Sequence, residues 1–458
     1  MERILAHIDD HFDAHLDQAR RFVRQPSISG EGIGMPEMAR LVADRITELG
    51  GRAEIVPTDG WPVVYGEIDQ GAPRTLLVYG MYDVQPVEGE TWMAPPFEGQ
   101  VVSLEGHGPS MVARGVYNTK GPLAGFFNVV HTLREVEGRL PVNLKFMIEG
   151  EEELGSVHLP QFVARHRDRL RADAAYFPFY MENAQGKPVM WLGVKGILFF
   201  ELTCRGGDWG GPTVRGIHGS NAVWISSPTW RLVQALRTMV GPDERILVDG
   251  LYDGVAPVSA DDEELLAALA RTFDEQTILQ DHDVKRFKYD LRGVDLLRRY
   301  LYDPTLNIDG LVSGYVGAAT KTLLPHEARA KMDVRMVPNM EPETVVATLR
   351  AHLDRHGYAD IELRVNEGYP PAKTSVRQPV VQALIRAVRR LGVEPEIWPH
   401  LGGSAPFYLF TGELRLPFAM GGLGHGGRPH SPNEYATVEG MKRFEKSVAA
   451  FLVEFARG

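Results

Sequence analysis

The chain has 458 residues, 44% of them hydrophobic and 24% charged, so it can bury at least one large core, and its length allows two or three domains. Its formal net charge of -11 argues against a nucleic-acid partner and against binding to an anionic membrane, because both are bound through clustered Lys and Arg. Cys204 is the only cysteine, which excludes intramolecular disulfides and fits a reducing compartment. The sequence contains no apolar signal-peptide core and no long apolar run, so we expect a cytoplasmic protein that does not enter a membrane.

Helices and strands alternate in the first third of the chain. Residues 4–23 and 36–49 have the apolar spacing of amphipathic helices. Residues 74–79 and 144–148 are short apolar runs typical of buried strands, and residues 122–136 between them have helical spacing. This β-α-β order predicts a mixed sheet covered by helices on both faces.

The middle of the chain changes character and reads as an inserted second domain. It contains strand-like and helical patterns around a glycine-rich loop, at 197–204, 206–220, 228–239, 328–337 and 342–353. Helical patterns at 378–391 and 438–455 then resume the first domain. We therefore expect a catalytic α/β domain in two parts, 1–196 and 371–458, with a lid domain at 197–370.

Several motifs follow one another in an order known from one enzyme family. They are YGMYDVQP at 79–86, RGVYNTKG at 114–121, IEGEEELGS at 148–156, KPVMWLGVKG at 187–196 and HSPNE at 430–434. Together they resemble the carnosinase and acetylornithine-deacetylase type of di-zinc amidohydrolase, also called aminoacylase-like metallopeptidases. The resemblance covers nearly the whole chain. It implies a zinc-peptidase-like three-layer α/β catalytic domain with an inserted ferredoxin-like α+β lid, and a homodimer formed through that lid.

The same resemblance implies that most metal ligands of the family are replaced. The positions of its first His, its bridging Asp and its third carboxylate are occupied by Met81, Asn118 and Phe179. Glu153 and His430 match ligands that are retained, and Glu182 is the acid nearest to Phe179. A thioether, an amide and a phenyl ring bind zinc poorly. We expect no di-metal centre, and either no metal or one divalent ion, zinc or manganese, on Glu153 and His430 with Asn118 or Glu182.

The resemblance also implies the catalytic groups. Glu152 matches the general base, Asp83 matches an orienting carboxylate, and His218 matches a lid histidine that polarises the substrate carbonyl. Lys120 follows Asn118 by two residues and could supply the positive charge that metal ions supply in the family.

A second set of residues is implied to bind the substrate. Arg335 in MDVRMVPN matches a lid arginine that grips a substrate carboxylate, and the turn containing Gly403 and Ser404 matches a binding loop with backbone N–H donors. Asn307 and Asn118 complete the predicted set. The expected partner is thus a small amide or peptide substrate with a carboxylate.

Each of these residues also has a structural explanation. Asp83 after a strand could form a turn, the carboxylates at 151–153 could lie at a solvated helix N-terminus, and His430 in a proline-rich loop could be structural. The glycines around His218 could form a tight turn, and Ser404 could cap a helix.

Three classes of function remain open. The first is an amidohydrolase or peptidase that cleaves an amide (C–N) bond in a small dipeptide, acyl-amino acid or related carboxylate, with Glu152 as general base and one metal ion or none. The second is a non-hydrolytic acyl- or proton-transfer enzyme on the same scaffold, and the third is a catalytically inactive ligand-binding homologue. The first class is favoured, because a catalytically inactive protein has no physical need of an acid, a base and a carboxylate-binding group together.

Overall fold

The computed structural model describes residues 1–183 and 185–458. Contacts between residues divide the chain into two compact units, each described by itself below. Unit 1 comprises Met1–Leu192, Thr374–Trp398 and Leu409–Gly458, and unit 2 comprises Gly193–Lys373 and Pro399–Tyr408. Within the described residues no helix is both long and apolar enough to cross a membrane.

The division differs from the expected domains in two ways. Its boundaries fall at 192/193 and 373/374 instead of 196/197 and 370/371. In addition, Pro399–Tyr408 belongs to unit 2 and not to the catalytic α/β part. The reason is local backbone pairing, since Leu401 bridges to Val194 and the Gly403 carbonyl accepts a hydrogen bond from the Lys195 N–H.

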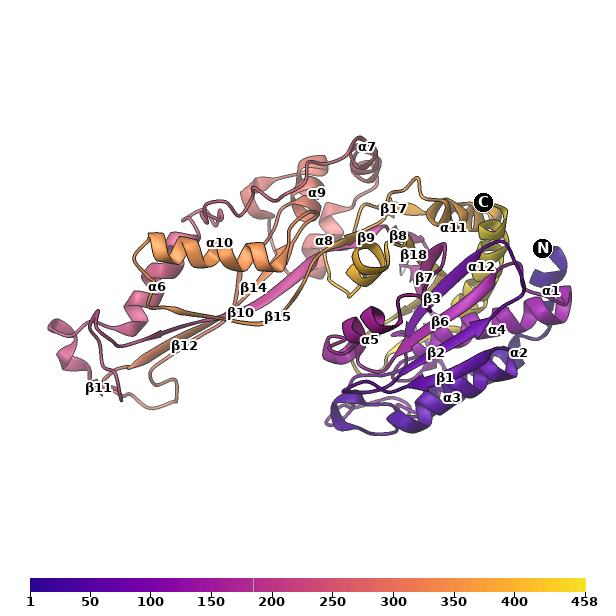
Figure 1. The fold of residues 1–458 in the computed structure, drawn as a ribbon, viewed down its shortest axis with the longest axis horizontal. Coiled ribbons are helices and arrows are strands. Elements are labelled where there is room, and N and C mark those ends of the chain that lie inside the picture. Colours follow the sequence, from indigo (N-terminus) through magenta and orange to yellow (C-terminus); the bar gives the residue numbers. More distant parts are fainter. Residues whose placement is uncertain (184) are drawn as a thin grey trace. The chain divides into compact units, whose positions relative to one another are not determined.

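Unit 1 is built on a nine-stranded mixed sheet (Figure 1). Its four middle strands are parallel, and the strand pairs toward both edges are antiparallel. In sheet order the strands are β1 (Arg52–Val56), β2 (Val63–Ile68), β6 (Asn143–Glu149), β3 (Thr75–Met81), β7 (Ala174–Glu182), β18 (Phe418–Gly427), β19 (Tyr435–Thr437), β5 (Gly108–Val112) and β4 (Gln100–Leu104). A separate parallel pair joins β8 (Val189–Trp191) to β17 (Glu396–Trp398).

Helices pack around this sheet. They are α1 (Glu2–Asp10), α2 (Phe12–Arg24), α3 (Met35–Glu48), α4 (Lys120–Glu137), α5 (Leu159–His166), α11 (Pro379–Arg390) and α12 (Val438–Arg457), with short helical turns η1 (Ser29–Glu31), η2 (Glu152–Leu154) and η5 (Leu409–Leu414). α4 packs on β3 and β7, and α12 packs on β18. The single helix expected over 4–23 is wrong, because His11 leaves helical geometry (φ -112°, ψ 12°) and separates α1 from α2.

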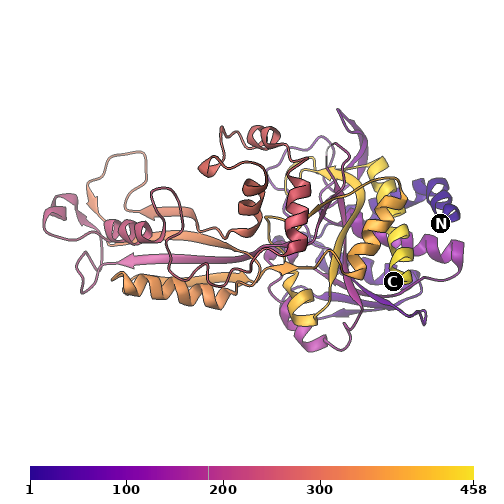
Figure 2. The same ribbon diagram turned by 90° about the horizontal axis from the view of Figure 1, so that it is seen from above.

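Unit 2 is a four-stranded antiparallel sheet with two long helices (Figures 1 and 2). In sheet order the strands are β12 (Asn307–Ser313), β14 (Glu327–Met336), β10 (Gly196–Arg205) and β15 (Glu362–Tyr369), and the helices are α6 (Pro228–Met239) and α10 (Pro342–Arg355). Alternate residues of β10 and β14 share one buried core with both helices, so α6 and α10 cover the same face. This order is ferredoxin-like, as expected for the lid.

The remaining elements of unit 2 are short. They are the pairs β9 (Gly193–Val194) with β16 (Ala372–Lys373) and β11 (Ile217–His218) with β13 (Leu323–Leu324), the helices α7 (Ala260–Leu269), α8 (Glu275–Asp281) and α9 (Gly293–Tyr302), and the turns η3 (Gly219–Val223) and η4 (Lys288–Asp290).

Candidate active site

Two parallel neighbours, β3 and β6, end side by side and present acidic residues at the same edge of the unit 1 sheet. Met81, the last residue of β3, pairs in register with Glu149 of β6. Asp83 follows β3 and is fully buried. Its carboxylate accepts hydrogen bonds from the backbone N–H groups of Glu152 (3.2 Å) and Glu153 (3.0 Å). Asp83 therefore holds the start of η2 in place, which is an orienting contact.

Three of the predicted residues meet directly in unit 1. The Asn118 amide nitrogen Nδ2 lies 3.0 Å from Glu153 Oε1 and 3.0 Å from His430 Nε2. His430 Nε2 lies 3.2 Å from Glu153 Oε2. The hydrogen bond with Glu153 raises the pKa of His430 above its ordinary value. We call Asn118, Glu153 and His430 the unit 1 triad.

Two further residues position this triad and were missed in the sequence. The Gln85 amide donates a hydrogen bond of 2.9 Å to Glu153 Oε2. The buried Glu434 carboxylate accepts from the N–H groups of Gly115 (3.1 Å), Tyr117 (2.9 Å) and Asn118 (2.9 Å). Both lie inside the motifs YGMYDVQP and HSPNE, so their place in those motifs was the available signal.

Glu152 has no hydrogen-bond partner for its carboxylate in the described part of the chain, although its backbone is fixed by Asp83. Burial, together with the neighbouring carboxylates of Glu153, Glu149 and Asp83, raises the pKa of Glu152 well above its ordinary value. An unengaged carboxylate with a raised pKa accepts a proton more readily than an ordinary carboxylate. This is the chemistry expected of a general base.

The Lys120 side chain lies inside unit 1. Its side chain is fully buried and its ammonium donates a hydrogen bond of 2.6 Å to the Gln25 carbonyl. Burial lowers the pKa of Lys120 to about 7, against the opposing effect of Asp83 and Glu434. The role expected for Lys120, a positive charge beside Asn118, stays a prediction; the carboxylates that act on its charge are those of Asp83 and Glu434.

Met81 and Phe179, which the sequence resemblance places at ligand positions, are packed among hydrophobic groups. Met81 is buried, and the Phe179 ring lies in an aromatic cluster with Tyr117 at 5.3 Å, Phe177 at 6.0 Å and Trp191 at 6.4 Å between ring centroids. They provide packing and no strong metal donor.

Glu182, the acid nearest to Phe179 in sequence, is committed to other partners. Its carboxylate pairs with Arg443 at 2.6 Å and accepts the Gly424 N–H at 2.8 Å. Its suggested role as a metal ligand stays a prediction, and an ion would have to displace Arg443 and Gly424 from its carboxylate.

All predicted substrate-binding residues except Asn118 lie in unit 2. Arg335 Nη1 donates a hydrogen bond of 2.8 Å to Ser404 Oγ, which in turn donates to the Gly196 carbonyl at 3.2 Å. Asn307 donates to Asp333 at 3.1 Å. Arg335 and Asn307 both line a cavity of 660 Å³ in this unit that also has Lys195, Arg299 and Asp303 in its wall.

His218 lies on the short strand β11 of unit 2 and is exposed. Its Nδ1 accepts the Ser220 N–H at 3.2 Å, and its Nε2 lies 3.1 Å from Thr322 Oγ1. These two hydrogen bonds orient the His218 ring. Gly403, another predicted binding residue, accepts a hydrogen bond from the Lys195 N–H through its carbonyl.

Comparison with known proteins decides the family. The family model described as Peptidase family M20/M25/M40 matches residues 77–454. The chain belongs to this family.

Individual M20 relatives match this chain over most or all of its length. The Beta-Ala-His dipeptidase of Rattus norvegicus is 27% identical over 100% of this chain and 96% of its own length. The Cys-Gly metallodipeptidase dug1 of Schizosaccharomyces pombe is 27% identical over 78% of this chain and 76% of its own length. The solved M20 metallo-carboxypeptidase Sso-CP2 of Sulfolobus solfataricus is 32% identical with a TM-score of 0.88, covering 97% of this chain and 99% of that protein. The fold is therefore the M20 fold, and the protein is a hydrolase of peptide-type C–N bonds.

M20 relatives are named as metalloenzymes, so the donor set of this chain can be tested against a metal ion. Donor atoms of one tetrahedral zinc ion lie about 3.3 Å apart, given bonds of about 2.0 Å. His430 Nε2 and Glu153 Oε2 lie 3.2 Å apart, whereas the Asn118 atom that contacts them is its amide nitrogen and only its carbonyl oxygen can serve as a ligand. Glu153 and His430 therefore fit a single ion by spacing and chemistry, and Asn118 fits it by chemistry.

Proposed function

We propose that this M20 protein hydrolyses the amide bond of a small dipeptide or acyl-amino acid that carries a free carboxylate. The observation that carries the proposal is the unengaged Glu152 carboxylate beside the unit 1 triad. In this assignment Glu152 takes the proton of the attacking water, and Asp83 keeps Glu152 in position through its backbone N–H.

Substrate recognition is assigned to unit 2 and Asn118. A guanidinium binds a carboxylate with two parallel hydrogen bonds, so Arg335 in the wall of its cavity is suited to the substrate carboxylate. Asn307, Gly403 and Ser404 contribute polar groups around it. His218 is assigned to the substrate carbonyl.

The site is assigned one divalent ion, zinc or manganese, or none. The unit 1 triad would hold this ion, and a bound ion supplies a Lewis acid that polarises a carbonyl and lowers the pKa of a water molecule. A second ion is not proposed, because Met81 and Phe179 offer no carboxylate or imidazole where the family resemblance places ligands. The protein's own groups, Glu152 and Asp83, act in the same way in either case.

Metal analysis and a substrate panel test this proposal together. The protein is depleted of metal, reconstituted with zinc or manganese, and its ions per chain are counted in wild type and in His430→Ala. Turnover is then measured on β-Ala-His, Cys-Gly and acetylated amino acids, each paired with its C-terminal amide. We expect His430→Ala to hold at most one ion fewer per chain than wild type, and hydrolysis of free acids in preference to amides.

Other outcomes contradict specific parts. Loss of two ions per chain in His430→Ala would overturn the ligand assignment. Binding of the free acids without turnover would favour the inactive ligand-binding homologue, and products lacking oxygen from water would favour acyl transfer. Arg335→Gln should raise KM for the free acids more than for the amides, whereas an equal rise would remove Arg335 from carboxylate recognition.

We further propose that two copies associate through unit 2, and that the protein works in the cytoplasm. β12 is an edge strand of its sheet, and its residues Ile308, Leu311 and Val312 are about half exposed. An apolar edge strand can pair with the same strand of a second copy. Light scattering of wild type and Leu311→Lys tests this: a dimer that becomes a monomer supports it, and an unchanged mass contradicts it.

A further inference from the structure

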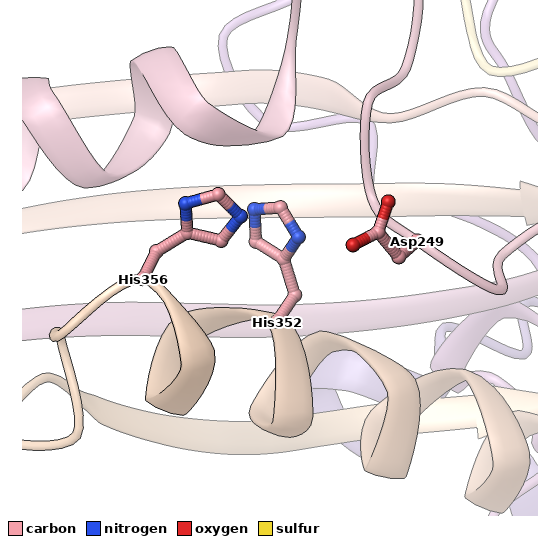
Figure 3. A group of neighbouring side chains, drawn as sticks. All are labelled: Asp249, His352 and His356. Carbon is pink, nitrogen blue, oxygen red and sulfur yellow. The ribbon is translucent and has the colours of Figure 1, made fainter.

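A second group of potential metal ligands lies within unit 2, away from every residue assigned above. Figure 3 shows Asp249, His352 and His356 with their polar ends turned toward one another. Each can offer one ligand atom, and these atoms all lie within 4.8 Å of one another. We call these residues the unit 2 triad.

The sequence brings the unit 2 triad together through one helix and one anchored loop. His352 lies in the last turn of α10 and His356 follows as its C-cap, so the four-residue spacing puts both rings on one face, with centroids 4.3 Å apart. Asp249 follows α6 in a loop that is fixed on either side by the buried Val248 and Leu251.

The protonation of His352 follows from its hydrogen bonds. The Thr238 hydroxyl donates to the Ala235 carbonyl at 2.6 Å, so its oxygen is an acceptor for His352 Nε2 at 3.0 Å. His352 Nε2 therefore carries the proton, and Nδ1 is left with a bare lone pair.

That lone pair is buried and unused. His352 is only 1% exposed, and Nδ1 has no hydrogen-bond partner among the described residues. A buried acceptor without a partner costs free energy, which a bound cation would recover. Metal-binding histidines commonly donate their other ring N–H to a neighbouring acceptor, as His352 does to Thr238.

We propose that Asp249, His352 and His356 form a binding site for one zinc-type divalent ion. Two imidazoles and a carboxylate are ligands that zinc accepts, with water in the remaining position. To bind one zinc ion, the ligand atoms must move from separations of up to 4.8 Å to separations of about 3.3 Å. The side chains of Asp249 and His356 are exposed and can move, while the hydrogen bond to Thr238 keeps His352 fixed.

One interaction competes with the ion. Arg355, between the two histidines in sequence, pairs with Asp249 at an exposed position. Exposed ion pairs contribute little free energy, so Asp249 can be released to the metal. The ion then connects the loop of Asp249 to α10 and stabilises unit 2 through binding.

Zinc binding measured apart from the unit 1 triad tests this proposal. The full chain carrying Glu153→Gln and His430→Ala is titrated with zinc chloride by calorimetry, and bound ions are counted. We expect one ion per chain and a rise in melting temperature. His356→Ala or Asp249→Asn, both exposed, should weaken binding at least tenfold and remove the rise.

The matched control is His282→Ala, an exposed histidine of unit 2 outside the triad. It should leave zinc binding unchanged. Absence of saturable binding, or equal affinity with and without His356→Ala, would overturn the site. If the Glu153→Gln/His430→Ala protein does not fold, the test is one ion fewer per chain in Asp249→Asn/His356→Ala than in wild type, and an equal count overturns the site.

Discussion

The unit 1 triad and the unit 2 triad contain similar side chains, but their potential ligand atoms differ in spacing and in hydrogen bonding. In unit 1, Glu153, His430 and Asn118 already bond to one another at 3.0–3.2 Å. In unit 2 the ligand atoms are up to 4.8 Å apart, and His352 Nδ1 has no partner in the part of the chain described. An ion must displace hydrogen bonds in the first triad, whereas it relieves an unmet acceptor in the second. The hydrogen bonds that the ligand atoms make in the metal-free protein therefore matter for metal binding as much as the number of ligands.

The strongest test of unit 1 as a reaction site is Glu152→Gln. We expect turnover to fall by about 10²–10⁴-fold, the usual contribution of a general base, because the amide cannot take up the proton. The fold should be retained, since the Glu152 carboxylate makes no hydrogen bond among the described residues. Steady-state kinetics and ion counting measure this, with the surface variant Glu48→Gln as control. Full activity would exclude Glu152 as the base.

A buried carboxyl group of unit 1, that of Glu149 at the end of β6, makes the stability of the protein depend on pH. Burial raises the pKa of Glu149 to about 8 from an ordinary value of 4.5. The folded state then binds one more proton than the unfolded state between these values, so this group's contribution to stability is lost as the pH rises from about 4.5 to about 8.

Glu149→Gln tests this sign. Between pH 5 and pH 8 the wild-type free energy of unfolding should fall more steeply than that of the variant, by up to about 1.4 kcal/mol per pH unit. Gln can still accept the hydrogen bonds that Tyr79 and Ser156 donate to Oε1. Denaturant unfolding at a series of pH values gives both curves. Parallel curves would show that Glu149 titrates normally in the folded protein.

Asn118→Asp changes the unit 1 triad toward the family pattern. The carboxylate lies beside Glu153, so it should lower the melting temperature of the metal-free protein and raise zinc affinity at least tenfold. Asn118→Ala, which removes the amide without adding charge, is the matched comparison. Equal affinity of Asn118→Asp and wild type would mean that Asn118 does not face the ion.

Much of the fold could be predicted from the sequence, because apolar periodicity and sequence motifs are local features. The helix at 228–239 has the bounds of α6, and the motifs after β3 and β6 meet because adjacent parallel strands end at one edge. The M20 family, its fold and its lid followed from motif order.

Contacts made by single side chains could not be predicted in the same way. Lys120 turns to a backbone carbonyl of Gln25, and Glu182 is held by Arg443, both far away in sequence. His352 and His356 have a recognisable four-residue spacing, but Asp249 lies about a hundred residues earlier and joins them only through packing. Such pairings depend on tertiary structure, which no local pattern contains.

The smallest expected effect comes from the ion pair beside the unit 2 triad. Arg355→Gln removes the cation that pairs with Asp249 and lies next to the proposed ion. An exposed pair of this kind is worth about 0.2–1 kcal/mol, so zinc should bind more tightly by a factor of about 1.4 to 5. The same titration of Arg364→Gln, an exposed arginine of β15, controls for the change in net charge. Weaker zinc binding in Arg355→Gln would mean that Arg355 orients Asp249 toward the ion instead of competing with it.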